Sequence, residues 1–148
     1  DFTLPILVGS IADARRVGVL DDRAQRLAAA LWPGPLTLVV PRTPHSGPWQ
    51  LGGDAASVGV RVPDHRLARA VLAGGPLATT SANRSGDPPA TTCDELHTAF
   101  GDDVALYLCD DAPLVGRAST VVSLLGPEPA ILRAGDVDAD VIARLSAA

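Results

Sequence analysis

The sequence contains no lysine and no methionine, and its 12 basic residues are all arginine. Because an initiator methionine is absent and the opening residues DFTLPILVGS already resemble a strand, we expect the chain to be part of a longer protein. Aromatic residues make up only 3%, so the core must be built from Val, Leu, Ile and Ala. A hydrophobic fraction of 47% is typical of a compact globular protein and excludes a disordered one.

Residues suited to metal or redox chemistry are few. Cys93 and Cys109 lack the spacing of metal-ligand or redox motifs, so we expect two reduced, partly buried thiols. The three histidines, His45, His65 and His97, are not spaced like the ligands of a metal site. A P-loop, a GxGxxG motif and a Ser-His-Asp order are also missing. We therefore expect neither a metal site nor one of these catalytic motifs.

The chain also lacks long apolar runs and a positive charge balance. No run approaches the roughly 20 residues that span a bilayer, and no signal segment opens the sequence. We expect a cytoplasmic protein that does not bind a membrane. The net charge of -5 argues against tight non-specific binding to a nucleic-acid backbone.

At 148 residues, the chain is long enough for one domain with a sizeable core, and we expect a single domain over 1–148. Apolar runs predict strands at residues 4–8, 36–40, 57–62, 77–80, 104–108, 119–125 and 129–133. Helical spacing predicts helices at 23–31, 67–72, 92–100 and 138–145. Because strands and helices interleave without strict alternation, we predict an α/β fold with a mixed sheet.

Small polar residues follow the strand predicted at 77–80, in the stretch TTSANRSGDPP. Ser81 and Asn83 either form a polar turn or line a pocket for a small polar ligand at a strand end. From the residue pattern alone, the turn is the favoured interpretation.

Two arginines occupy unusual positions. Arg61 lies in the valine-rich strand SVGVRV, where an unpaired charge is costly to bury. Its fork of donors suits a carboxylate or phosphate, and a surface aspartate is the alternative partner. Arg133 ends PAILR and is either a phosphate partner or a solvated charge. Ser119 opens the strand STVVSLL, where its hydroxyl could also satisfy its own backbone.

Four motifs follow one another along the chain: LWPGPLTLVV, VGVRVPDH, TSANRSGDPPATT and STVVSLLGPEPAILRAG. Together they resemble the YrdC-like family of threonylcarbamoyl-AMP synthases, from about Leu4 to Gly135. The resemblance implies a twisted mixed α/β sheet with flanking helices and a concave ligand pocket, a YrdC/RibB-like fold. It also implies a nucleotidyltransferase that makes threonylcarbamoyl-AMP and pyrophosphate from L-threonine, bicarbonate and ATP for the threonylcarbamoyladenosine modification of tRNA.

The resemblance assigns substrates and partners to particular positions. It implies an L-threonine site formed by Arg61, Thr79 and Ser119. It implies an ATP site formed by Ser57, Ser81, Asn83, Pro89 and Arg133. ATP with Mg²⁺ would be the substrate complex, with no tightly bound cofactor and no covalent enzyme intermediate. The downstream partner would be the transferase complex of tRNA modification.

Two other functions remain open at this point. One is the YrdC-like carbamoyl-adenylate domain of a hydrogenase-maturation carbamoyltransferase. The other is an RNA-binding module for double-stranded RNA or tRNA, which the net charge of -5 makes the weaker choice.

The family carries a T-[DE]-T-x-Y-G-L segment and a phosphate-gripping K-x-R motif upstream of these four motifs. This chain begins after the position of K-x-R and has no lysine, so we expect an N-terminally truncated domain that is almost inactive by itself. Threonine-dependent pyrophosphate release from ATP and bicarbonate tests this, in this chain and in a version extended upstream to the nearest start codon. Robust turnover by the 148-residue chain alone would contradict the expectation.

Overall fold

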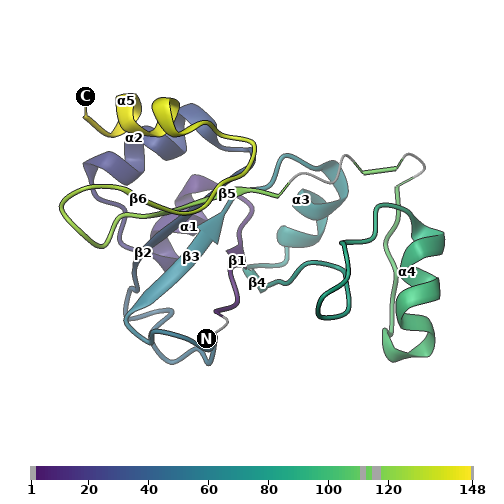
Figure 1. Cartoon of the computed structure of the whole chain (residues 1–148). Coiled ribbons are helices and arrows are strands. Elements are labelled where there is room, and N and C mark those ends of the chain that lie inside the picture. The colour runs from purple at the N-terminus through teal and green to yellow at the C-terminus, as the bar shows by residue number, and fades with distance from the viewer. Residues whose placement is uncertain (1–2, 111–112, 115–117, 148) are drawn as a thin grey trace. The chain divides into compact units, whose positions relative to one another are not determined.

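The computed structural model describes residues 3–110, 113–114 and 118–147 (Figure 1). The chain forms two compact units: the first comprises residues 1–79 and 118–148, and the second comprises residues 80–117. Each unit is described by itself below. The expectation of one domain over the whole chain stays a prediction.

The first unit is built on a six-stranded mixed sheet in the order β4-β1-β3-β2-β5-β6. The strands are β1 (Ile6–Leu7), β2 (Leu36–Pro41), β3 (Ser57–Arg61), β4 (Leu77–Ala78), β5 (Thr120–Ser123) and β6 (Ala130–Arg133). The pairs β1/β3 and β2/β5 are parallel, and the other neighbours are antiparallel. Apolar runs place β2 and β3 at the centre, where both faces are covered. The predicted mixed α/β sheet is confirmed.

Four helices belong to the first unit: α1 (Ile11–Val17), α2 (Asp22–Leu31), α3 (Arg66–Leu72) and α5 (Ala139–Ala147). The Asp21 side chain accepts a hydrogen bond from the Ala24 amide and begins α2, the helix that the sequence predicted at 23–31. Helix α5 packs against α2, where Arg26 donates to the Leu145 and Ser146 carbonyls. The sequence analysis missed α1, which Ser10 caps and whose Val17 is fully buried.

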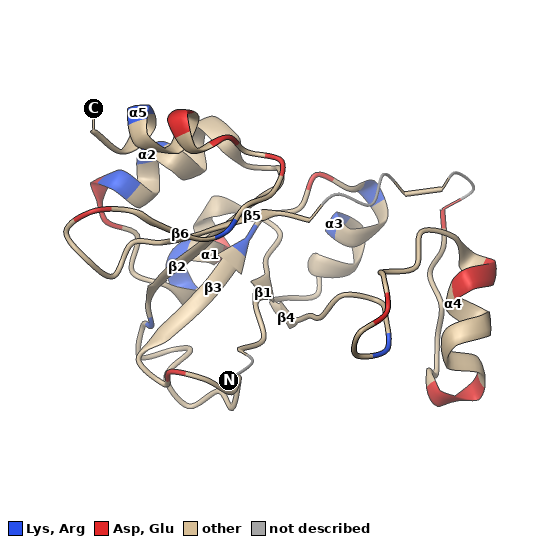
Figure 2. Cartoon of the chain, in the orientation of Figure 1, with Lys and Arg blue, Asp and Glu red and all other residues tan. Residues whose placement is uncertain are grey.

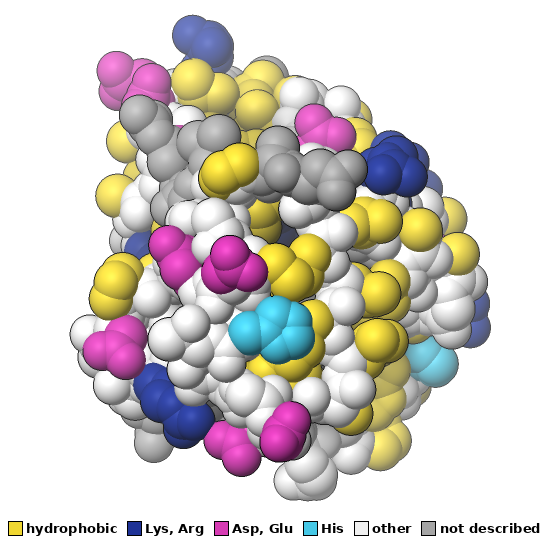
Figure 3. Space-filling model, turned by 90° about the vertical axis from the view of Figure 1, so that its right-hand side faces the viewer, with side chains coloured by type: hydrophobic (Ala, Val, Ile, Leu, Met, Phe, Trp, Pro, Cys, Tyr) yellow, Lys and Arg dark blue, Asp and Glu magenta, His cyan; other side chains and the backbone are white. Residues whose placement is uncertain are grey.

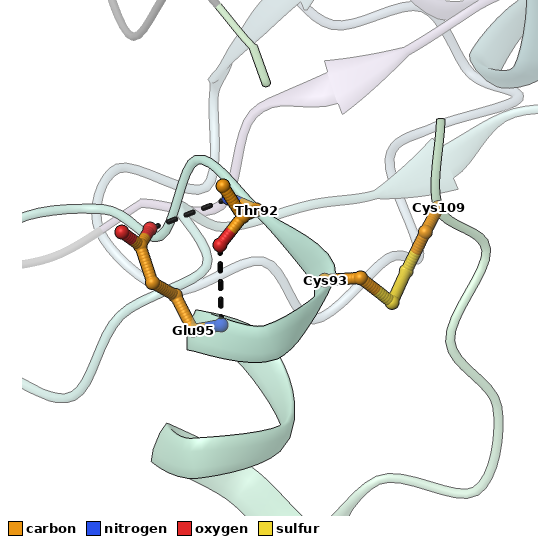
Figure 4. The surroundings of a disulfide bond; sticks show 4 residues. All are labelled: Thr92, Cys93, Glu95 and Cys109. Carbon is orange, nitrogen blue, oxygen red and sulfur yellow. Dashed lines mark hydrogen bonds between the residues drawn. A yellow bond between two sulfur atoms is a disulfide. The ribbon is translucent and has the colours of Figure 1, made fainter. Parts of the chain in front are cut away.

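The second unit contains α4 (Cys93–Phe100) and the short 3₁₀ helix η1 (Gly101–Asp103). A capping box begins α4: the Glu95 amide donates to the Thr92 hydroxyl, and the Thr92 amide donates back to the Glu95 carboxylate (Figure 4). The hydrogen bond from the Thr91 amide is the largest cause of a lowered pKa at Glu95. This end of α4 is therefore fixed by local side-chain bonds.

Two expectations about the second unit were wrong. Cys93 and Cys109 form a disulfide, with Cα atoms 5.7 Å apart, because the chain after η1 returns beside the first turn of α4 (Figure 4). The strand expected at 104–108 is absent from the described residues. In the described part of this unit no neighbouring strand pairs with that segment's backbone, and the side chains of Leu106 and Leu108 are exposed.

The disulfide makes a testable contribution to the second unit. It closes a ring with a sequence separation of 16, for which chain-entropy arguments give about 3 kcal/mol. The double substitution Cys93→Ser and Cys109→Ser should therefore speed amide hydrogen exchange in α4 by about two orders of magnitude. Amides of α2 serve as the internal control. Unchanged protection of α4 would show that the ring adds no stability there.

Candidate functional site

The side chains of Thr37, Arg61, Ser119 and Arg133 come together at one end of the sheet in the first unit. Strand register brings them there: Leu38 in β2 lies opposite Val60 in β3, and Leu36 lies opposite Thr120 in β5. Figure 2 shows the arginine-bearing segments at the end of β3 and on β6. This group is called the arginine–serine cluster below.

Arg61 is half-buried at the last position of β3. Its Nε donates to the Gly34 carbonyl at 2.9 Å, and the Gly34 amide donates to the Val62 carbonyl at 2.9 Å. These two bonds hold the WPGP turn against β3. Within the part of the chain that the structure describes, the two Nη atoms of Arg61 have no hydrogen-bond partner. The turn therefore fixes the arginine while its outer donors stay available to a ligand.

Ser119 is the polar centre of the cluster and is only 5% exposed. Its Oγ lies 2.9 Å from the Thr37 Oγ1 and accepts a hydrogen bond from the Arg133 Nη2, also at 2.9 Å. Arg133 also donates to the Ser119 carbonyl from Nε and Nη2. These bonds tie the end of β6 to the residue before β5, and they hold the guanidinium of Arg133, which is exposed as a residue.

The two arginines affect each other electrostatically. Burial is the largest cause of a lowered pKa at Arg61; Arg133 lowers it further, and Asp136 raises it. Like charges held close together in a partly buried place repel each other, and an anion between them removes that repulsion. Carboxylates and phosphates match the guanidinium fork in shape and charge. The cluster is therefore suited to bind an anionic group.

Two predicted site residues of the first unit lie apart from this cluster. Ser57 begins β3, four residues from Arg61, which is roughly 13 Å along a strand. Thr79 follows β4, where its amide and hydroxyl both donate to the Pro5 carbonyl. Its hydroxyl is thus used by the backbone, and the structure brings neither residue to Arg61.

The remaining predicted residues, Ser81, Asn83 and Pro89, belong to the second unit. Ser81 and Pro89 are exposed, and the Ser81 carbonyl accepts from the Asn83 amide at 3.0 Å. The Asn83 side-chain nitrogen donates to the Arg84 carbonyl at 2.9 Å. Its Oδ1 is buried without a hydrogen-bond partner among the described residues. A buried acceptor of this kind is a place where a ligand donor would fit.

A separate hollow of about 840 Å³ lies in the first unit beside α1, α3 and the loop after α3. Its charged lining consists of Asp13, Arg16, Asp64, Arg66 and Arg69. None of the predicted site residues lines it, so it is not the pocket that the sequence led us to expect. We place the candidate site at the arginine–serine cluster, because buried polar groups and charges converge there.

Thr37 is the cluster residue that the sequence analysis missed. It is 5% exposed and bonded to Ser119. The signal was present: Thr37 is the one polar residue in the apolar strand LTLVV. Among the described residues, no group of three His, Cys, Asp or Glu side chains could hold a metal ion. No helix in that same part of the chain has the length and apolar character needed to cross a membrane.

Comparison with known proteins gives one consistent family. The Sua5/YciO/YrdC family model, described as "Telomere recombination", matches residues 1–135. A Mycobacterium tuberculosis protein named "Putative threonylcarbamoyl-AMP synthase" is 40% identical over 148 residues, covering 98% of this chain and 67% of the relative. A Chromohalobacter salexigens protein named "Threonylcarbamoyl-AMP synthase" is 42% identical, covering 74% of this chain and 59% of that relative.

Solved structures agree on the fold. Sua5 of P. abyssi, crystallised in complex with L-threonine, matches with a TM-score of 0.82 and 28% identity, covering 97% of this chain and 43% of Sua5. Full-length HypF in a phosphate- and nucleotide-bound form matches with a TM-score of 0.70 at 15% identity, which shows a shared fold alone. The chain thus spans about two thirds or less of the length of these proteins.

Gly135 offers a test of how tightly the cluster is packed. A Cβ atom there would lie 2.4 Å from the Ala118 carbonyl oxygen and 2.5 Å from backbone atoms of Ser119 and Thr120. Gly135→Ala should therefore push β6 away from Ser119 and lower the free energy of unfolding by about 1–3 kcal/mol, as measured by urea titration. Gly126→Ala is the matched control, because its nearest contact would be 3.8 Å. Equal stability of the two variants would refute this.

Proposed function

The chain belongs to the Sua5/YciO/YrdC family, and we propose that it is the L-threonine-binding and adenylate-forming part of a threonylcarbamoyl-AMP synthase. The observation that carries the proposal is the pair of neighbouring arginines, Arg61 and Arg133, of which Arg133 donates to the buried Ser119 hydroxyl. Both substrates of such an enzyme are anionic: threonine through its carboxylate and ATP through its phosphates. An arginine beside each anion would supply the charge and the hydrogen-bond donors that a carboxylate or a phosphate accepts.

In this proposal Arg61 binds the threonine carboxylate with its outer Nη donors, and Ser119 lies beside it. Arg133 contacts the phosphates of ATP, which enters as its Mg²⁺ complex. The threonine amine attacks carbon dioxide and loses a proton, or attacks bicarbonate with loss of water, and forms a carbamate. A carbamate oxygen then attacks the α-phosphate of ATP, the bond to the β-phosphate oxygen breaks, and pyrophosphate leaves. The protein contributes positioning and charge stabilisation.

The predicted site residues outside the cluster differ in the support that they have in this proposal. Ser57 and Thr79 stay assigned to ATP and threonine by resemblance alone. Asn83 has the support of its unpartnered buried Oδ1, which suits a donor such as the adenine amino group or a ribose hydroxyl. The product would serve the transferase complex of tRNA modification in the cytoplasm.

The two alternative functions have less support. The relatives at 40% and 42% identity are named as synthases, whereas the likeness to HypF at 15% identity extends only to the fold. An RNA-binding module would need a basic surface. The chain carries a net charge of -5, and the described residues on the face shown in Figure 3 intersperse acidic side chains with hydrophobic ones without a continuous basic area.

The proposal predicts that Arg61→Ala weakens L-threonine binding by about 10- to 100-fold, measured by calorimetric titration, because a hydrogen bond to a charged group is lost. Arg61→Lys should give an intermediate loss, since lysine keeps the charge but not the fork. Arg69→Ala is the control, because it lines the separate hollow. Equal threonine affinity in Arg61→Ala and the unsubstituted chain would remove Arg61 from the site.

A further inference from the structure

Thr37 stands out because it places a hydroxyl inside an apolar strand. Its neighbours in β2, Leu36 and Leu38, are fully buried, and Thr37 itself is 5% exposed. A valine would fill nearly the same space there without a polar atom to satisfy. Burying the Thr37 hydroxyl is therefore costly unless it forms a hydrogen bond.

That hydroxyl has one partner in the described part of the chain, the Ser119 Oγ at 2.9 Å. The distance alone does not say which oxygen donates. In either direction one buried hydroxyl proton lacks an acceptor among the described residues: the Thr37 proton if Ser119 donates, and the Ser119 proton if Thr37 donates. Under the proposed function an anionic ligand accepts the Ser119 proton, which assigns Thr37 as the donor and the Ser119 Oγ as the acceptor.

This direction decides what Ser119 can do. A serine oxygen offers two lone pairs and one proton. One lone pair accepts from the Arg133 Nη2 at 2.9 Å, and the other accepts from Thr37. Since both lone pairs are occupied, the Ser119 hydroxyl can approach a third group only as a donor.

The third group must then be an acceptor, and the surrounding charge makes it a negative one. Arg133 contacts Ser119 directly, and it also lies near enough to lower the pKa of Arg61. Under the proposed function, on which this step rests, the acceptor beside Arg61 is the carboxylate of L-threonine. We propose that Thr37 is a positioning residue: it orients the Ser119 hydroxyl so that Ser119 donates a hydrogen bond to that carboxylate.

Thr37→Val and Thr37→Ser separate this role from packing. Valine keeps the shape and removes the hydroxyl, whereas serine keeps the hydroxyl and removes a methyl group. Calorimetric titrations would use two ligands, L-threonine and its neutral amide, L-threoninamide. We expect Thr37→Val to weaken L-threonine binding by about tenfold and threoninamide binding by less than about twofold, because a donor is worth more to a charged acceptor. Thr37→Ser should bind L-threonine as the unsubstituted chain does.

A double-mutant cycle adds a second readout. In a Ser119→Ala background the hydroxyl that Thr37 orients is gone, so Thr37→Val should cause no further loss of L-threonine affinity. Thermal unfolding of every variant shows whether the fold is intact. A purely structural role would weaken both ligands equally and would persist in the Ser119→Ala background.

The outcomes separate this inference from the proposed function. If the unsubstituted chain binds L-threonine and Thr37→Val binds it equally well, the role of Thr37 is overturned and the function stands. An equal loss for L-threonine and threoninamide also overturns the role of Thr37. If the unsubstituted chain binds no L-threonine, the proposed function fails, and the role of Thr37 fails with it.

Discussion

The candidate site depends on two neighbouring arginines that backbone carbonyls hold in place. Arg61 and Arg133 repel each other, and burial adds to the cost of charging Arg61. Backbone carbonyls offset that cost: Gly34 accepts from Arg61, and the Ser119 carbonyl accepts from Arg133. Because backbone acceptors are neutral, they hold the guanidinium groups without cancelling their charge, and an arriving anion meets both.

The rest of the first unit maintains this arrangement. The WPGP turn sets the position of the Gly34 carbonyl, and its link to Val62 ties the turn to the strand that carries Arg61. On the other side, Gly135 lies so close to the backbone of β5 that no side chain fits between them. These backbone contacts hold in place the Gly34 and Ser119 carbonyls that accept from the two arginines.

Helix α4 of the second unit has no buried residue, so it is not stabilised by a hydrophobic core. The interactions that stabilise it are local: the capping box at Thr92, the disulfide between Cys93 and Cys109, and the hydrogen bonds of Arg84. Arg84 donates to the Ala99 carbonyl and to the Asp103 carboxylate, so it ties the loop that contains Asn83 to the far end of α4. The Arg84 guanidinium and the Asp103 carboxylate are both largely exposed, so their ion pair adds little to the free energy of unfolding.

The sequence by itself determined the mixed α/β sheet, the ends of α2 and α4, and the positions of Arg61 and Arg133 at the ends of strands, since local periodicity and capping residues are written in the chain. Tertiary structure alone decided the rest. It joined the two cysteines and left 104–108 without a partner strand among the described residues. It also gave the Thr37 hydroxyl its partner 82 residues away. Such outcomes depend on which distant segments meet, and a pattern read along one chain does not contain that information.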